Sequence, residues 1–270
     1  MGGRSNVGKS TLVNRLVGRK VAIVTPKPQT TRRRILGILS GPDAQVIFID
    51  TPGIHETERL INRRMVEAAP ELDRRDRAFI AEMNSIARPK VLVVNKIDFI
   101  GRERILPMLE QCREAAPDAE IVPVSALTGE NVAELIETIK NLLPEGPSLM
   151  PEDEYTDQSE RMLAGEVIRE KLFLKVHEEI PFTSAVRVEQ FVEEPERKLI
   201  RIAALIVVER DSHKAIVIGA GGRMIKEIGT AARLELEEIL GSKVFLELHV
   251  KADPHWTRSL RKLEEMGIGT

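Results

Sequence analysis

The chain has 270 residues, of which 42% are hydrophobic and 30% charged, which is typical of a folded, soluble protein with two domains. Its 40 basic and 42 acidic residues give a net charge of -2, which excludes nucleic-acid binding through the whole surface and leaves a local basic patch for any such contact. The single cysteine excludes an internal disulfide, and no apolar run approaches the roughly 18 residues of a membrane span, so we expect a cytoplasmic protein.

The sequence begins with a phosphate-binding motif. Residues 3–10 read G-R-S-N-V-G-K-S, which fits the P-loop pattern G-x-x-x-x-G-K-S. Its glycines allow backbone N–H groups to surround a polyphosphate at a helix N-terminus, where the helix dipole also favours an anion. Lys9 would neutralise the β- and γ-phosphates, and Ser10 would bind Mg²⁺. The residues predicted to contact a nucleotide here are Gly3, Asn6, Val7, Gly8, Lys9, Ser10 and Thr11.

A Pro- and Arg-rich stretch follows, with the sequence P-Q-T-T-R at residues 28–32. One threonine hydroxyl there could complete the Mg²⁺ shell only while the γ-phosphate is present, which would make the stretch a switch that the triphosphate orders. Thr31 is favoured as the metal ligand, with Thr30 as the alternative.

An aspartate ends the predicted strand Gln45–Asp50 and opens the sequence D-T-P-G. Asp50 would hold Mg²⁺ through a water molecule, and the Gly53 N–H would contact the γ-phosphate. Ras-like proteins have a glutamine directly after this motif to orient the attacking water, where this chain has Ile54. The neighbouring His55 is more typical of a solvated loop histidine than of a base, so hydrolysis should be slow without help.

Two further strands, Lys90–Asn95 and Glu120–Val124, alternate with predicted helices at Ile105–Ala115 and Val132–Leu143. Short apolar strands that alternate with helices indicate a parallel α/β sheet.

Each of these two strands ends at a motif that fits guanine. After the first comes N-K-I-D, where the Asp98 carboxylate can accept from the N1–H and 2-amino groups, donors that adenine lacks. The Asn95 amide can reach the N7/O6 edge, and the Lys96 stem can cover the ring. After the second strand, Ser125, Ala126 and Leu127 would place a backbone N–H at guanine O6. The motifs in this order predict a guanine nucleotide.

Three prolines within residues 144–151 mark a linker, because proline lacks a backbone donor and disfavours helix before it. We therefore expect a nucleotide-binding domain at 1–144, a linker at 145–156 and a second domain with a C-terminal tail at 157–270. The second domain should contain a helix at Ser159–His177, strands at Thr183–Val192 and Lys198–Glu209, a short helix, a long helix at Arg223–Leu240 and a last strand at Lys243–Lys251.

Residues 216–226, I-V-I-G-A-G-G-R-M-I-K, look like the core of a type II KH domain. The G-x-x-G loop has no bulky side chains, so the phosphates of single-stranded RNA can approach the backbone between two helices. Ile216, Ile218 and Ile225 would support the bases. The residues predicted to contact RNA are Lys214, Ile218, Gly219, Ala220, Gly221, Gly222, Arg223 and Lys226.

Together these motifs resemble the Era family of bacterial GTPases across nearly the whole chain, and residues 162–172 and 208–218 strengthen the likeness. The resemblance implies an α/β P-loop GTPase domain followed by an α+β type II KH domain. Its implied function is GTP-controlled binding of the 3′ end of small-subunit ribosomal RNA while the small ribosomal subunit matures.

The same resemblance implies GTP or GDP with Mg²⁺, and a catalytic role for Lys9, Asn6 and Gly53. In the subgroup with this P-loop, an asparagine at the position of Asn6 can also coordinate K⁺. The family further implies a monomer, with peripheral contact at the inner face of the cell membrane in addition to the cytoplasm.

The chain departs from the family in three places. Ser5 stands where proline is usual, and Ala220 replaces a frequent basic or polar residue, which should weaken a phosphate contact. The third departure concerns the sheet, because no apolar strand precedes the P-loop, and residues 68–84 read as a charged helix where the family has its fourth strand. In the family the second, third, first, fourth, fifth and sixth strands lie side by side, so these absences should split the sheet and expose unpaired backbone groups.

We therefore expect either that the natural protein has residues missing here or that the chain is a truncated fragment. Intact P-loop and N-K-I-D residues favour a GTP-hydrolysing assembly factor. The missing strands favour the alternative, an RNA-binding module whose truncated nucleotide domain no longer works. The N-K-I-D motif and the KH core exclude a metabolite kinase.

Overall fold

The computed structural model describes residues 1, 6–27, 34–50, 72–259 and 261–262. Contacts divide the chain into two compact units, one with Met1–Ala22 and Arg34–Asp157 and the other with Ile23–Arg33 and Gln158–Thr270. No helix within the described ranges is both long and apolar enough to cross a membrane.

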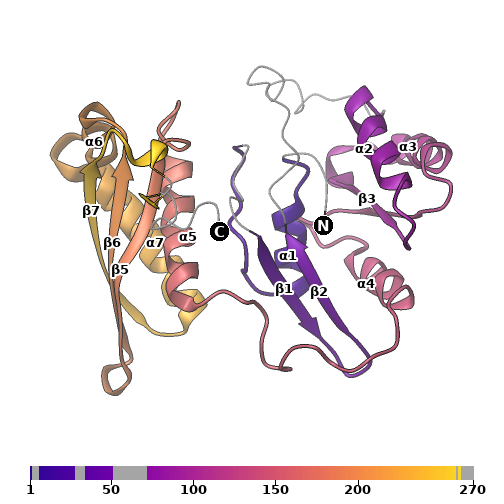
Figure 1. Cartoon of the computed structure of the whole chain (residues 1–270), viewed down its shortest axis with the longest axis horizontal. Coiled ribbons are helices and arrows are strands. Elements are labelled where there is room, and N and C mark those ends of the chain that lie inside the picture. The colour runs from indigo at the N-terminus through magenta and orange to yellow at the C-terminus, as the bar shows by residue number, and fades with distance from the viewer. Residues whose placement is uncertain (2–5, 28–33, 51–71, 260, 263–270) are drawn as a thin grey trace. The chain divides into compact units, whose positions relative to one another are not determined.

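The first unit opens with helix α1 (Lys9–Val17), which packs against the strands β1 (Ile35–Ser40) and β2 (Gln45–Asp50) (Figure 1). The helix begins after Gly8, at φ 89°, and ends at Gly18, at φ 74°. Both values lie in the left-handed region that glycine tolerates best. The two strands are antiparallel and in continuous register.

The sequence pattern does not predict strand β1, whose sequence I-L-G-I-L-S has a glycine in its middle. A glycine inside a strand weakens the pattern and often marks a close approach of another backbone. Here a Cβ on Gly37 would lie 2.8 Å from Val13 Cγ1 and 2.9 Å from Val17 Cγ2. Gly37 therefore weakens the sequence signal for strand β1 and, at the same time, allows α1 to pack closely on that strand.

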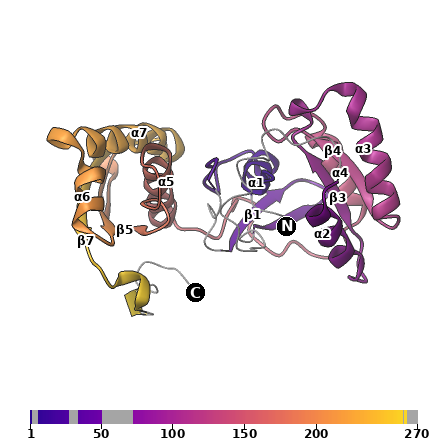
Figure 2. The ribbon, with the colours of Figure 1, turned by 90° about the horizontal axis from the view of Figure 1, so that it is seen from above.

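The other two strands of this unit, β3 (Val91–Asn95) and β4 (Glu120–Val124), are parallel, as predicted. Helix α3 (Arg102–Ala115) connects them and starts three residues earlier than the pattern predicts. Helix α4 (Val132–Asn141) follows β4. Figure 2 shows α2, α3 and α4 around these two strands.

The described stretch between β2 and β3 contains a helix, α2 (Arg74–Asn84), and no strand. Asp73 and Asp76 form a capping box at its N-terminus, in which each side chain accepts from the backbone N–H of the other residue. Ile80 buries the inner face of the helix against Ala116 and Ala119. The charged helix predicted for this region is therefore present.

The strands of the first unit form two separate sheets, β1–β2 and β3–β4, within the described part of the chain. This is the split expected from the absence of the first and fourth strands. The hydrophobic core, however, is continuous. Leu12, Val13 and Leu16 of α1 share one buried cluster with Phe48 from one sheet and Val124 from the other. Helix α1 therefore joins the two sheets, which the strand pattern does not indicate.

Residues 149–157 lie along the first unit. The Gln45 side chain accepts from the N–H groups of Leu149 and Met150, both at 2.9 Å, and donates to Met150 O at 2.9 Å. Further contacts follow β1: Ile38 N–H donates to Tyr155 O at 2.9 Å, Leu36 N–H donates to Asp157 Oδ1 at 3.1 Å, and Gly37 bridges Thr156.

The second unit has the predicted order of helix, strand, strand, helix, helix, strand. Strands β5 and β6 are antiparallel and β6 and β7 parallel, and Figure 1 shows α5 and α7 on one face of this sheet. Leu163 and Ile168 of α5, Ile202 of β6 and Leu236 of α7 are buried together there. The elements are α5 (Glu160–Lys175), β5 (Ser184–Glu194), β6 (Leu199–Val208), α6 (Asp211–Ile218), α7 (Arg223–Leu240) and β7 (Lys243–Ala252).

Candidate functional site

Two hydrogen bonds connect the phosphate loop to the N-K-I-D loop. Asn95 Nδ2 donates to Val7 O at 2.8 Å, and Lys96 Nζ donates to Asn6 O at 2.6 Å. Lys96 itself has a left-handed backbone, with φ 70°, which turns the chain into the short 3₁₀ helix that carries Asp98. Burial lowers the pKa of the Lys96 ammonium, and the Asp98 carboxylate partly offsets that effect. These bonds hold the two motifs side by side although the strands expected between them are absent from the described residues.

Two of the predicted Mg²⁺ ligands, Ser10 and Asp50, also meet. Ser10 Oγ donates to Asp50 Oδ2 at 2.8 Å, and Asp50 is fully buried at the end of β2. Burial lowers the pKa of the neighbouring Lys9 ammonium, and the Asp50 carboxylate partly offsets that effect. Hydroxyl and carboxylate oxygens are hard ligands of the kind that Mg²⁺ prefers, and the metal usually completes its shell with water and phosphate oxygens. The pair therefore fits the predicted metal.

The loop after β4 lies against the same asparagine. Ala126 N–H donates to Asn95 Oδ1 at 3.0 Å, and the Ser125 side chain is buried and accepts from Thr128 N–H at 3.1 Å. Asp98 and Leu127 are exposed. The structure thus brings Asn6, Val7, Gly8, Asn95, Lys96 and Ala126 together, with Lys9, Ser10 and Thr11 on the first turn of α1. The predicted residues Gly3, Thr30, Thr31 and Gly53, and the neighbouring Ile54 and His55, lie outside the described residues.

In the second unit, three glycines with positive φ angles form the turn between α6 and α7, at φ 74° for Gly219, 59° for Gly221 and 77° for Gly222. A Cβ on Gly219 would lie 2.7 Å from Met224 Cβ, whereas one on Gly221 or Gly222 would meet nothing within 4 Å. The last two glycines therefore present backbone with open space around it, as the approach of a phosphate requires.

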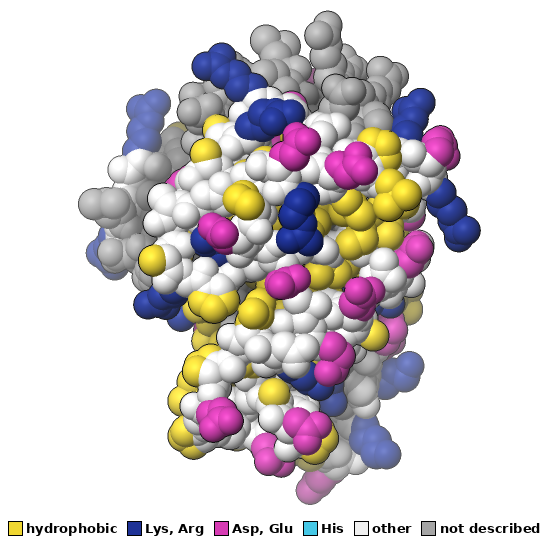
Figure 3. Space-filling model, turned by 90° about the vertical axis from the view of Figure 1, so that its right-hand side faces the viewer, with side chains coloured by type: hydrophobic (Ala, Val, Ile, Leu, Met, Phe, Trp, Pro, Cys, Tyr) yellow, Lys and Arg dark blue, Asp and Glu magenta, His cyan; other side chains and the backbone are white. Residues whose placement is uncertain are grey.

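The other predicted RNA-contacting residues surround this turn. Lys214 and Ile218 are half-buried on α6, Ala220 is exposed in the turn, and Arg223 and Lys226 are exposed at the start of α7. By contrast, on the face of the molecule in Figure 3 the basic and acidic side chains are interspersed. The three basic side chains near the turn, Lys214, Arg223 and Lys226, are where the sequence predicts a local basic contact in a chain of small net charge.

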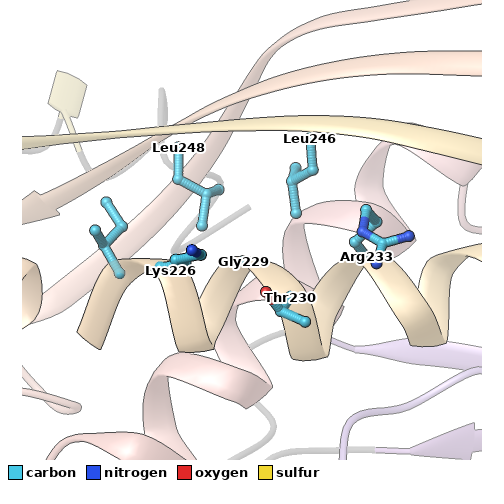
Figure 4. Close-up of a pocket in the computed structure, with 7 residues that line it drawn as sticks. Lys226, Gly229, Thr230, Arg233, Leu246 and Leu248 are labelled. Atoms are coloured by element: carbon cyan, nitrogen blue, oxygen red, sulfur yellow. The ribbon is translucent and has the colours of Figure 1, made fainter. Parts of the chain in front are cut away.

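A pocket of about 300 Å³ lies between α7 and β7, beside this turn. Figure 4 shows Leu246 and Leu248 pointing from β7 toward the helix. A Cβ on Gly229 would lie 3.4 Å from Leu248 Cδ1, which is an ordinary van der Waals contact. An apolar floor with polar side chains at its rim suits a flat base. The pocket is lined by Ile225, Lys226, Gly229, Thr230, Arg233, Leu246 and Leu248.

Of the three isoleucines predicted to support bases, Ile225 lines this pocket, and Ile216 and Ile218 do not. The other lining residues, Gly229, Thr230, Arg233 and the two leucines of β7, are not among the residues predicted from the sequence. The alternation of apolar residues along β7 was a usable signal for the leucines, but it does not say which side of the strand stays open.

Two family models match the chain. One described as a 50S ribosome-binding GTPase matches residues 1–116, and one described as a KH domain matches residues 179–257. GTPase Era of Syntrophus aciditrophicus is 46% identical over 282 aligned residues, which cover 98% of this chain and 92% of that protein. The chain belongs to the Era family. GTPase Era of Geobacter metallireducens is 44% identical, with 98% of this chain and 95% of that protein covered.

Solved structures of Era agree with this assignment. A variant of Era from Aquifex aeolicus, bound to GDP and AlF4⁻, is 38% identical with a TM-score of 0.89. A structure of Era in complex with MgGDPNP and nucleotides 1506–1542 of 16S ribosomal RNA is 40% identical with a TM-score of 0.88. Each match covers 99% of this chain and 97% of the other.

The alignment to the Syntrophus protein also bears on the missing strands. Its 282 positions exceed the 270 residues of this chain by 12, so that relative has at least 12 residues, between matched positions, that have no counterpart here.

Proposed function

We propose that the chain binds and hydrolyses GTP with Mg²⁺ and binds the 3′ end of small-subunit ribosomal RNA through its KH domain, so assisting maturation of the small ribosomal subunit. The observation that carries this proposal is the pair of hydrogen bonds between the N-K-I-D loop and the phosphate loop. In these, Asn95 Nδ2 donates to Val7 O and Lys96 Nζ donates to Asn6 O. A nucleotide domain that had lost its function would not be expected to retain these bonds beside an intact Ser10–Asp50 pair.

The small subunit is favoured over the large one. The description of the family model names the 50S subunit, but that model matches residues 1–116 alone. The Era structure solved with 16S ribosomal RNA matches 99% of the chain, including the KH domain. A protein that acts on ribosomal subunits works in the cytoplasm. In this proposal, the open turn at Gly221 and Gly222 contacts phosphates, and the pocket between α7 and β7 takes a base.

Lys9 would stabilise the charge that develops on the phosphates, and the Gly53 N–H would contact the γ-phosphate. Asn6, whose backbone is left-handed at φ 62°, would coordinate K⁺ and add a second cation there. Thr31, with Thr30 as the alternative, would bind Mg²⁺ only in the triphosphate state. The monomeric state and the peripheral membrane contact stay predictions that rest on the family alone.

Titration with the fluorescent analogue mant-GTP separates this function from the alternative, an RNA-binding module without a working nucleotide domain. We expect the 270-residue chain to bind mant-GTP with micromolar affinity and to prefer it over mant-ATP, and to bind a single-stranded RNA with the 3′-terminal small-subunit sequence. A chain that binds this RNA but not mant-GTP would support the alternative.

The predicted contact of Asp98 with guanine is tested by Asp98→Asn. The asparagine offers an amide donor where the 2-amino group needs an acceptor, so GTP affinity should fall at least about fivefold, since a mispaired polar contact costs ~1–3 kcal/mol. Xanthosine triphosphate has an oxygen at that position and should bind better than it does to the parent. Competition against mant-GTP measures both affinities, and the assignment is wrong if neither changes.

A further inference from the structure

Arg15, on the second turn of α1, holds the loop that follows β4. Its Nε donates to Ala126 O at 3.1 Å, and its Nη2 donates to Leu127 O. Gly129 lies below the guanidinium, since a Cβ there would be 3.8 Å from Arg15 Cζ. The contact spans more than a hundred residues of sequence and ties the helix that carries the P-loop to the last of the predicted guanine motifs.

The loop offers three backbone N–H groups, and two of them already donate. Ser125 N–H donates to Glu130 O at 3.1 Å, and Ala126 N–H donates to Asn95 Oδ1 at 3.0 Å. Leu127 N–H has no hydrogen bond within the described part of the chain. In a planar trans peptide the N–H points opposite to the preceding carbonyl. By holding Ala126 O, Arg15 therefore fixes the Leu127 N–H on the far side of that peptide.

We propose that Arg15 is a positioning residue for guanine recognition, and that it aims the Leu127 N–H at O6 of the base. This inference rests on the proposed function, because it requires a guanine nucleotide between the N-K-I-D loop and this loop. A positioned N–H donor favours ligands that present a good acceptor to it, so Arg15 should raise affinity most for nucleotides with a good acceptor at position 6 of the base. It should matter little for recognition of the 2-amino group by Asp98.

An arginine suits this role better than a lysine. The guanidinium presents several donors in a rigid plane and can bond two carbonyls at once, whereas an ammonium is a compact point charge on a flexible stem. Arg15→Lys should therefore retain charge and helix propensity but hold one carbonyl at a time. It should give an intermediate phenotype between the parent and Arg15→Ala.

The test compares three nucleotides in competition with mant-GTP. Beside GTP, 6-thio-GTP replaces O6 by sulfur, which is a weak acceptor, and ITP lacks the 2-amino group. The parent should prefer GTP over both. Arg15→Ala should weaken GTP binding about fivefold to tenfold, as expected for one lost hydrogen bond, and should bring the ratio of GTP to 6-thio-GTP affinity close to one. The ratio of GTP to ITP affinity should not change.

Arg19→Ala is the matched control, since Arg19 lies just beyond the same helix with its guanidinium 4.8 Å from the centre of the Tyr155 ring. It should leave both ratios as in the parent. An equal loss of all three nucleotides in Arg15→Ala would overturn the proposal and leave Arg15 a purely structural role, and so would unchanged GTP affinity. Failure of the proposed function would instead appear as absence of mant-GTP binding by the parent, which would overturn both.

Discussion

Gly8→Ala should lower GTP affinity roughly 100-fold or more, because a methyl group at this position would overlap the Asn95 side chain, which bonds the phosphate loop to the N-K-I-D loop. A Cβ on Gly8 would lie 2.4 Å from Asn95 Nδ2, and the residue has φ 89°, which an L-side chain rarely adopts. Asn95 cannot simply move aside, since its amide also donates to Val7 O and accepts from Ala126 N–H. Left-handed strain and overpacking each cost ~1–3 kcal/mol. Titration with mant-GTP measures the loss.

Gly18→Ala provides the control for backbone strain. Gly18 has a comparable φ of 74°, but a Cβ there would meet nothing within 4 Å. We expect this variant to lose some thermal stability, because the strain is the same in kind, and to bind mant-GTP as the parent does. If Gly8→Ala binds as tightly as Gly18→Ala, then the contact between the phosphate loop and Asn95 does not shape the site.

Gly222→Asp should reduce binding of single-stranded RNA about 100-fold while GTP binding is retained. Space is open at this position, since a Cβ would meet nothing within 4 Å, and the strain of a side chain at φ 77° is shared with the Gly222→Asn variant described below. The loss should come from charge, because like charges brought together at an interface cost several kcal/mol. Fluorescence anisotropy with labelled RNA at several salt concentrations measures it.

Gly222→Asn separates the charge from the side chain. Asparagine is nearly the same size and tolerates the left-handed backbone, so this variant should lose much less affinity and should keep the salt dependence of the parent. Gly241→Asp adds the same charge at the other end of α7, where φ is 63° and the space is also open, and should bind RNA normally. Equal RNA affinity for Gly222→Asp and the parent would contradict the KH assignment of this turn.

Much of the fold is predictable from local sequence signals. The strands β3 and β4, helix α7 and the element order of the second unit follow from apolar runs, periodicity and glycine positions. Strand β1 is not predictable in this way, because the reason for Gly37 is the helix packed above it. The absence of two strands from the sequence pattern correctly predicts that the sheet is split. It does not predict the continuous core, because helix α1 joins the two sheets through buried side chains that are far apart in the sequence.

The candidate site shows the same limit. The motifs identify which residues face a nucleotide, because each motif has a characteristic spacing. They do not reveal that the motifs contact one another directly, as in the bond from Lys96 to Asn6 O and the hold of Arg15 on Ala126 O. Those contacts join residues about 90 and 110 positions apart and depend on the completed fold. The pocket between α7 and β7 is lined by residues much closer in sequence, but its existence also depends on the completed fold, because the alternation along β7 does not show which side of the strand stays open.

The bonds that hold residues 149–157 along β1 matter for anyone who wishes to study the two domains apart. A nucleotide-binding piece cut after Pro144 would lose the partners of Leu36 and Ile38 N–H, and the outer side of β1 would offer those donors to another molecule. Uncovered strands of this kind promote self-association. A piece cut after Asp157 retains the residues that bond the outer side of β1. Residues 155–157, which follow the proline-rich segment, thus cover the outer side of β1, and a nucleotide-binding piece that retains them should aggregate less than one that lacks them.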